Sequence, residues 1–162
     1  MLIKILYTLF LALIVALFVG LGIDAFYPGP KAPEYPIELE KPYETGHQET
    51  KQEEQARLAY FEEQKQFQEE SKVYNRNVSI VAIVFAIAIL VVCLTLLAKI
   101  KMIADGILLG GIFTTIYAII RGLMSEDSKF RFLVVTVGLI IALFLGYLKF
   151  VKNKKLITEL KK

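Results

Sequence analysis

The chain has 162 residues, of which 56% are hydrophobic, and it carries a formal net charge of +3 at pH 7 with a mean hydropathy of +0.54. A soluble domain of this length rarely gathers so many apolar residues into continuous runs, which argues against an ordinary soluble fold. The modest and unevenly spread charge gives no support to nucleic acid as a partner.

Four apolar runs of 17 to 21 residues are Ile5–Ile23, Val78–Ala98, Met102–Ile120 and Phe132–Leu148. Such lengths suit helices that cross a hydrocarbon core of about 30 Å. In lipid every backbone amide must be paired within its own segment, so helix is the expected conformation. We therefore predict an all-α integral membrane four-helix bundle. In it, a long extramembrane helix is continuous with the second transmembrane helix.

Residues 1–23 form the first predicted transmembrane helix, with Lys4 as the only charge near its start. A signal peptide is the alternative, and Gly20-Leu21-Gly22 is compatible with a cleavage site. The apolar run is longer than the core of about 7–15 residues that signal peptides use. We therefore expect the segment to be retained as an anchor.

Residues 24–46 are rich in proline and tyrosine and are predicted to be an extended connector, because proline fixes its own φ and biases the preceding residue away from helix. Its tyrosines, including Tyr27 and Tyr35, can anchor in the headgroup layer. The segment is either a linker that returns the chain to the next helix or a docking strip for a partner.

Residues 47–77 are dominated by Glu, Gln and Lys, with no glycine or proline, and predict a charged extramembrane helix. Together with the second apolar run, this segment forms a helix of about 78 Å from His47 to Ala98, at about 1.5 Å per residue. Tyr60, Phe67 and Tyr74 recur every seven residues and so share one side of the helix. We expect them to pack against the connector or a partner, and Tyr60, Phe67, Tyr74, Tyr27 and Tyr35 are the candidate partner contacts.

Residues 78–151 hold transmembrane helices two to four, and small residues recur at every fourth position in the first, third and fourth helices. Such rows let helix backbones approach closely in lipid. They favour packing within one bundle, with contact to a second copy or to another membrane protein as the alternative. The candidate helix-packing residues are Ala12, Ala16, Gly20, Gly106, Gly110, Gly138, Ala142 and Gly146.

Residues 152–162 form a basic tail that we place in the cytoplasm. Lysines cluster at Lys99–Lys101 and from Lys149 to Lys162, almost free of acidic neighbours. Positive charge in short flanking segments marks the cytoplasmic side. We therefore expect both termini in the cytoplasm of a plasma or inner membrane, and the charged helix on the outer side.

The sequence contains no recognisable catalytic set. Cys93 and His47 are the only cysteine and histidine, and no phosphate-binding glycine loop is present. We expect no enzyme activity, no cofactor and no metal. The predicted function is an accessory or scaffold subunit that contacts the bilayer and another membrane or extracytoplasmic protein, or itself. The alternative is a homo-oligomeric pore or passive carrier lined by the glycine–threonine face of the third helix.

Overall fold

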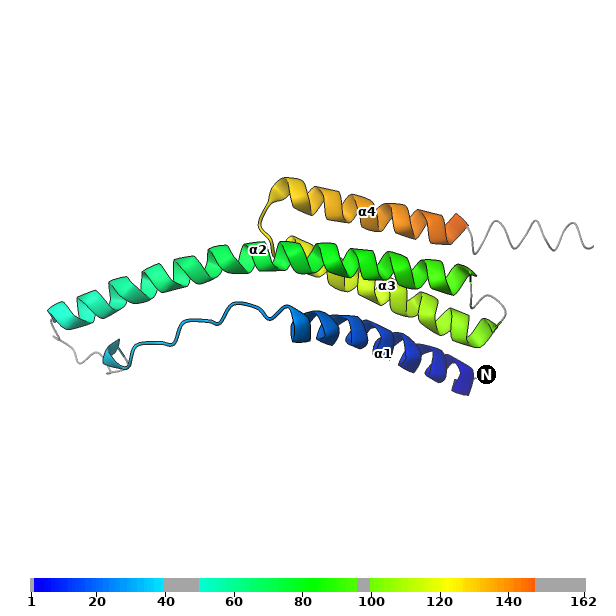
Figure 1. Cartoon of the computed structure of the whole chain (residues 1–162), viewed down its shortest axis with the longest axis horizontal. Coiled ribbons are helices and arrows are strands. Elements are labelled where there is room, and N and C mark those ends of the chain that lie inside the picture. The colour runs from blue at the N-terminus through cyan, green and yellow to red at the C-terminus, as the bar shows by residue number, and fades with distance from the viewer. Residues whose placement is uncertain (1, 40–49, 96–99, 148–162) are drawn as a thin grey trace, which may run out of the picture.

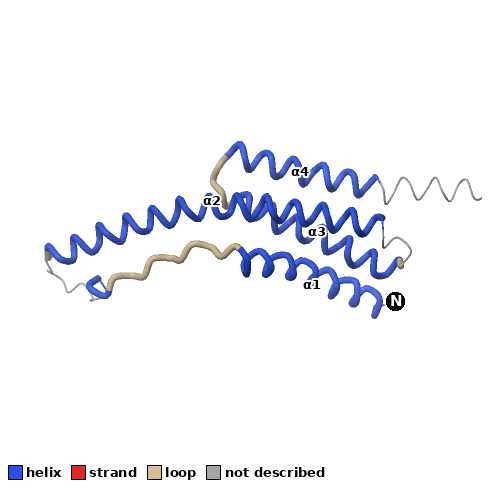
Figure 2. The backbone as a smooth tube through the Cα atoms, viewed as in Figure 1, coloured by secondary structure: helices blue, strands red, loops and turns tan. Residues whose placement is uncertain are grey.

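A computed structural model describes residues 2–39, 50–95 and 100–147 (Figure 1). In chain order these residues form α1 (Leu2–Phe26), a short 3-10 helix η1 (Ile37–Leu39), α2 (Lys51–Thr95), α3 (Lys101–Leu123) and α4 (Ser128–Gly146). Within these ranges the secondary structure is helix and loop without strands (Figure 2). The all-α prediction is therefore confirmed for the described chain.

All four α-helices are long and apolar enough to cross a membrane. Much of their apolar surface faces outward, since only 11% of the most apolar stretch of α1, and the same share in α4, is buried within the protein. A water-soluble protein rarely leaves apolar surface this continuous in contact with solvent. Outward apolar faces on helices of spanning length are typical of an integral membrane protein.

Helix α2 continues without interruption from the charged segment into the second apolar run, so the predicted continuity of these two segments is confirmed over Lys51–Thr95. Its 45 residues correspond to about 67 Å at about 1.5 Å per residue. The chain has no glycine or proline in this range, and the helix curves only gently (Figure 1). Residues 96–98, predicted to complete this span, lie outside the described residues.

The start of α2 differs from the prediction, which placed it at His47. Residues 47–49 lie outside the described part of the chain, and Thr50 is not helical. The Glu53 carboxylate accepts hydrogen bonds from the Thr50 backbone N–H (2.8 Å) and hydroxyl (2.9 Å), and the Glu53 N–H donates to the Thr50 hydroxyl oxygen (3.3 Å). This reciprocal arrangement is a capping box. It fixes Lys51 as the first helical residue.

The start of α4 also differs, because Ser128 and not Phe132 begins the helix. The Asp127 carboxylate accepts hydrogen bonds from the backbone N–H groups of Lys129 (2.9 Å) and Phe130 (3.3 Å). An acidic side chain at this position satisfies amides that have no partner within the helix. The cap therefore extends α4 beyond the apolar run by one turn.

Helix α3 is the centre of the bundle, with α1 and α2 packed along it and α4 on a further side (Figure 1). Its glycines mark the closest approaches. A Cβ at Gly110 would lie 2.7 Å from Val15 Cβ, and one at Gly106 would lie 2.8 Å from Leu11 Cδ2, so α1 rests directly on the α3 backbone. At Gly111 the nearest atom is Leu90 Cδ2 of α2, at 2.8 Å. Where helices face lipid, such close contacts supply dispersion attraction in place of the hydrophobic effect.

A pair of glycine substitutions tests this packing. Gly110→Ala places a methyl group where Val15 and the Ala12 carbonyl leave no room, and overpacking of this kind costs about 1–3 kcal/mol. Gly146→Ala is the matched control, because a Cβ there meets nothing within 4 Å. We expect Gly110→Ala to lower the melting temperature in detergent and Gly146→Ala to leave it unchanged or slightly raised. Equal losses would contradict the close α1–α3 contact.

Candidate functional site

Residues 24–26, predicted to belong to the connector, instead complete α1, and residues 40–46 lie outside the described part of the chain. The described connector, residues 27–39, lies along the N-terminal half of α2 and is extended as far as the short helix η1 (Figure 2). Two aromatic pairs hold it there. The rings of Tyr27 and Tyr74 stack with centroids 5.3 Å apart, and those of Tyr35 and Tyr60 meet edge to face at 5.4 Å. We call residues 27–39 and 51–77 together the arm. Aromatic pairs in these geometries are worth about 0.5–1.5 kcal/mol beyond the area they bury.

Gly29 lets the connector approach Tyr74 closely. A Cβ built on Gly29 would lie 3.1 Å from the Tyr74 ring, tighter than an ordinary van der Waals contact. The Asn77 amide also donates a hydrogen bond of 3.0 Å to the Tyr27 hydroxyl. The connector is thus positioned by both ring packing and a directional polar contact where it leaves α1.

Arg121 lies at the C-terminal end of α3 and joins that helix to the arm. Its Nη1 donates to Asn75 Oδ1 at 2.9 Å, and its Nε donates to the Tyr117 hydroxyl at 3.2 Å. The guanidinium carbon also lies 5.7 Å from the Tyr74 ring centroid and 5.5 Å from that of Tyr117, within cation–π range. A cation in the last turn also suits the negative end of the helix dipole. We call Tyr27, Tyr74, Asn75, Tyr117 and Arg121 the junction.

Ser79 ties α2 to α3 just beyond the junction. Its hydroxyl is fully buried and donates to the Ala118 carbonyl at 2.7 Å. Gly122 makes room for it, since a Cβ there would lie 2.9 Å from Ser79 Oγ. The hydrogen bond fixes the lengthwise register of the two helices, because it joins a side chain to one particular carbonyl.

An ion pair links the arm to the turn between α3 and α4. Lys72 Nζ lies 2.9 Å from Glu126 Oε2 and 3.1 Å from Glu69 Oε1. Its hydrogen bond to Glu126, followed by that to Glu69, raises the pKa of Lys72, and the same Lys72 contact lowers the pKa of Glu126. Glu126 lies in the turn between the two helices and has a φ of 59°, in the left-handed region. Both side chains are solvent-accessible, so the pair is expected to stabilise only weakly.

Four of the five predicted partner-contact residues pair with one another inside the chain, as Tyr27 with Tyr74 and Tyr35 with Tyr60. The fifth, Phe67, is half-buried on the same helix. Tyr74 is buried, whereas Tyr35 keeps 53% of its surface exposed. Their role in contacting another protein stays a prediction.

The predicted helix-packing residues fall into three groups. Those at tight helix contacts are Ala12, Gly106 and Gly110 between α1 and α3, and Gly138, where a Cβ would lie 2.7 Å from Ile119 of α3. Gly20 faces Tyr117 at a looser 3.9 Å, and Ala16 is half-buried. Ala142 and Gly146, by contrast, line an open groove.

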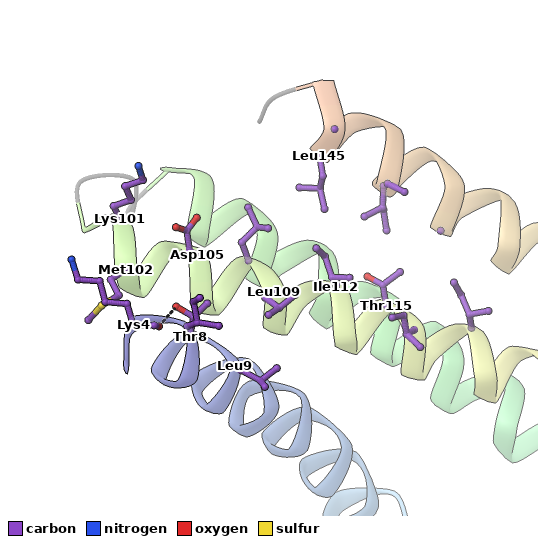
Figure 3. A pocket seen from close by; sticks show the side chains of 18 residues that line it. Lys4, Thr8, Leu9, Lys101, Met102, Asp105, Leu109, Ile112, Thr115 and Leu145 are labelled. Carbon is purple, nitrogen blue, oxygen red and sulfur yellow. Dashed lines mark hydrogen bonds between the residues drawn. The ribbon is translucent and has the colours of Figure 1, made fainter. Parts of the chain in front are cut away.

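This groove lies between α1 and α4 with α3 as its floor, and its cavity volume is about 1100 Å³ (Figure 3). Thr115 reaches it, but the Thr114 and Thr115 hydroxyls donate to the Gly110 and Gly111 carbonyls of their own helix, at 2.9 Å each. Gly106 and Gly110 face α1 and Gly111 faces α2. In a single chain, therefore, the glycine–threonine face of α3 is mostly used for packing.

No contact was predicted from the sequence for Arg121, Asn75 or Ser79. The structure brings all three to the α2–α3 contact. A signal was present, because Asn75 and Ser79 are spaced i, i+4 and so share one helix face at the start of an apolar run. Polar residues on one face at that depth indicate a neighbouring helix with a complementary group.

Comparisons with protein-family models, curated proteins and solved structures found no match.

The polar contacts of the junction hold segments of the chain together. Each one joins two different elements or two neighbouring turns of one helix. The described residues hold no group of three or more His, Cys, Asp or Glu side chains placed for a metal ion. Cys93 is buried, and its thiol donates to the Ala104 carbonyl at 3.0 Å.

Replacement of Arg121 tests the junction. Arg121→Met keeps an apolar stem but removes the donor to Asn75, whose side chain is only 6% exposed. An unsatisfied buried amide costs about 1–3 kcal/mol, so the melting temperature in detergent should fall and the connector should become more sensitive to protease. Arg76→Met, at an exposed arginine of α2, is the control and should change neither. Identical behaviour of the two variants would refute the role of Arg121.

Proposed function

We propose that this protein is an integral membrane subunit that carries a stiff arm on one side of the bilayer and works through contact with another protein, as an accessory or scaffold subunit. The continuity of α2 carries the proposal. Residues 51–77 are helical and precede the apolar run at Val78, so about 40 Å of helix, at about 1.5 Å per residue, extends beyond the span.

The paired connector supports a role as a rigid support. Extended chain packed on the helix through two aromatic pairs makes the arm two layers thick over part of its length. The junction at Arg121 fixes the base of the arm to the bundle. A rigid arm loses little conformational entropy when a partner binds, which favours affinity.

A groove on the arm offers a contact surface of defined chemistry. Its volume is about 500 Å³, and its walls are the connector at Tyr27–Pro30 and the α2 residues Glu69, Glu70, Val73 and Tyr74. Glu69 pairs with Lys72 and Glu70 accepts a hydrogen bond from Gln66, but the Glu69 side chain stays 66% exposed. Their negative charge beside proline, valine and aromatic surface favours a partner segment that presents a basic side chain next to an apolar one. Phe61, with 55% of its surface exposed, lies farther along the arm.

We place both termini in the cytoplasm and the arm outside, in a plasma or inner membrane. Lysine clusters at Lys99–Lys101 and Lys149–Lys162 support this orientation. The tail from residue 148 lies outside the described residues, so for this segment the argument rests on its composition alone.

Thiol labelling tests the orientation. In intact cells, Gln52→Cys on the arm should react with a membrane-impermeant thiol reagent, and Lys155→Cys in the tail should react only after the membrane is opened. The native Cys93 is buried and serves as the background measurement in the unmodified protein. Labelling of Lys155→Cys and not Gln52→Cys in intact cells would show that the orientation is reversed.

Crosslinking tests the partner contact. A photoreactive residue at Val73, in the arm groove, should capture one protein stoichiometrically from native membranes, and one at Leu139, on an exposed face of α4, should not. Glu70→Lys should reduce that capture by reversing the charge at the groove, while Glu54→Lys at the distant end of the arm should not. The melting temperature of all variants should match that of the parent. Crosslinks only between copies of this chain would contradict the accessory role and favour a homo-oligomer.

A further inference from the structure

The groove between α1 and α4 is charged at one end and apolar along the rest of its length, which matches an amphiphilic ligand. The proposed arm contact does not involve this groove. From α1 and α4 the lining residues are mainly leucine, isoleucine, alanine and glycine, and α3 adds leucine, isoleucine and methionine. Its charged lining residues, Lys4, Lys101 and Asp105, gather at one end (Figure 3). The remaining length is apolar except for two threonines whose hydroxyls bond backbone carbonyls.

The groove opens at the depth that the hydrocarbon of a bilayer would occupy. All three helices that line it are long and apolar enough to span a membrane. Along α4 it extends from Gly138 to Gly146, about 12 Å at about 1.5 Å per residue, which is close to the thickness of one leaflet of a core of about 30 Å. The floor on α3 is longer, from Lys101 to Ile119.

Small residues on α4 keep the groove open. At the end of the groove away from the two lysines, α4 touches α3 closely, since a Cβ at Gly138 would lie 2.7 Å from Ile119 Cδ1. Two turns later, a Cβ at Gly146 would meet nothing within 4 Å, although Gly146 lines the groove. Gly146 therefore leaves this part of the groove wall open.

We propose that this groove binds one anionic phospholipid, with an acyl chain between α1 and α4 and the phosphate at Lys4 and Lys101. Basic pockets between transmembrane helices bind anionic headgroups in this way. In Figure 3 both ammonium groups point outward from the end of the groove, as lysines that reach the headgroup layer do. Asp105 also lines this end and reduces its positive charge, so the three charged lining residues together carry a formal charge of +1.

The separation of charged and apolar residues along the groove favours one class of ligand over the others. A free phosphate would satisfy the lysines and leave the apolar length empty. A zwitterionic lipid would fill the apolar length but bring its own cation to the lysines. A phospholipid with an anionic headgroup matches both parts, because burial of its chain and the charge of its headgroup are favourable at the same time.

Lipid titration in detergent tests the headgroup. Phosphatidylglycerol should raise the melting temperature of the full-length protein more than phosphatidylcholine with identical acyl chains, and glycerol phosphate alone should have no effect. In the double variant Lys4→Gln, Lys101→Gln, the affinity for phosphatidylglycerol should fall about 30-fold, since each lysine is worth about 1 kcal/mol and about 1.4 kcal/mol is tenfold. The control double variant Lys31→Gln, Lys129→Gln changes two exposed lysines outside the groove and should bind as the parent does.

Tryptophan fluorescence tests the position of the chain and does not depend on the lysine variants. The protein has no tryptophan, so Leu9→Trp in the groove and Phe18→Trp on an exposed face of α1 each provide a single reporter. Phosphatidylglycerol brominated on its acyl chains should quench Leu9→Trp with saturation at one lipid per protein. It should quench Phe18→Trp weakly and without saturation.

Several results would overturn the proposal. Equal shifts of the melting temperature with the two phospholipids would show that the groove does not distinguish their headgroups. An equal shift with glycerol phosphate would show that the site binds phosphate and not a lipid. Equal, unsaturable quenching at both tryptophans would show that the chain does not enter the groove. A stable dimer that dissociates on Ala142→Trp, with no dependence on lipid, would mean that a second copy fills the space.

Discussion

The guanidinium of Arg121 lies where three segments of the chain meet, and the arrangement of the arm depends on it. It bonds Asn75 of α2 and Tyr117 of its own helix, and it lies near the face of Tyr74. Tyr74 in turn stacks on Tyr27 of the connector. One side chain at the end of α3 therefore positions both layers of the arm, and through the connector it also fixes where the chain leaves α1.

The helix contacts within the bundle and the contacts at the base of the arm depend on different kinds of interaction. Between apolar helices in lipid, association depends on close dispersion contacts, which explains why α1 rests on the backbone of α3 at Gly106 and Gly110. At the base of the arm, hydrogen bonds and ring contacts have preferred directions, so they set angle and register. The buried bond from Ser79 to the Ala118 carbonyl lies between the two regions and fixes the register for both.

The helices could be predicted from the sequence because each apolar run is long and the helix that becomes α2 lacks any breaking residue. Their exact starts could not, since the caps at Thr50 and Asp127 depend on local hydrogen bonds that extend or shorten a helix by a turn. The seven-residue spacing of Tyr60, Phe67 and Tyr74 predicted a shared face. It could not show which connector rings meet that face, because the path of an extended chain leaves no periodic signal. The contact of Arg121 with Asn75 joins residues 46 positions apart and was equally hidden.

Small residues on α3 and α4 look alike in sequence but have opposite effects in the structure. At Gly110 a residue of α1 fills the space that a side chain would occupy, whereas at Ala142 and Gly146 the space remains open as part of the groove. The difference arises because α4 packs on α3 at Gly138 and joins a buried cluster with Leu90 of α2 through Ile141 and Leu145, whereas its side toward α1 is left open as the groove. Helix α4 also begins two residues after Glu126, which forms an ion pair with Lys72 of the arm. Whether a small residue lies at a close helix contact or beside open space is therefore set by the helix opposite it, and the spacing of small residues along one helix does not specify that neighbour.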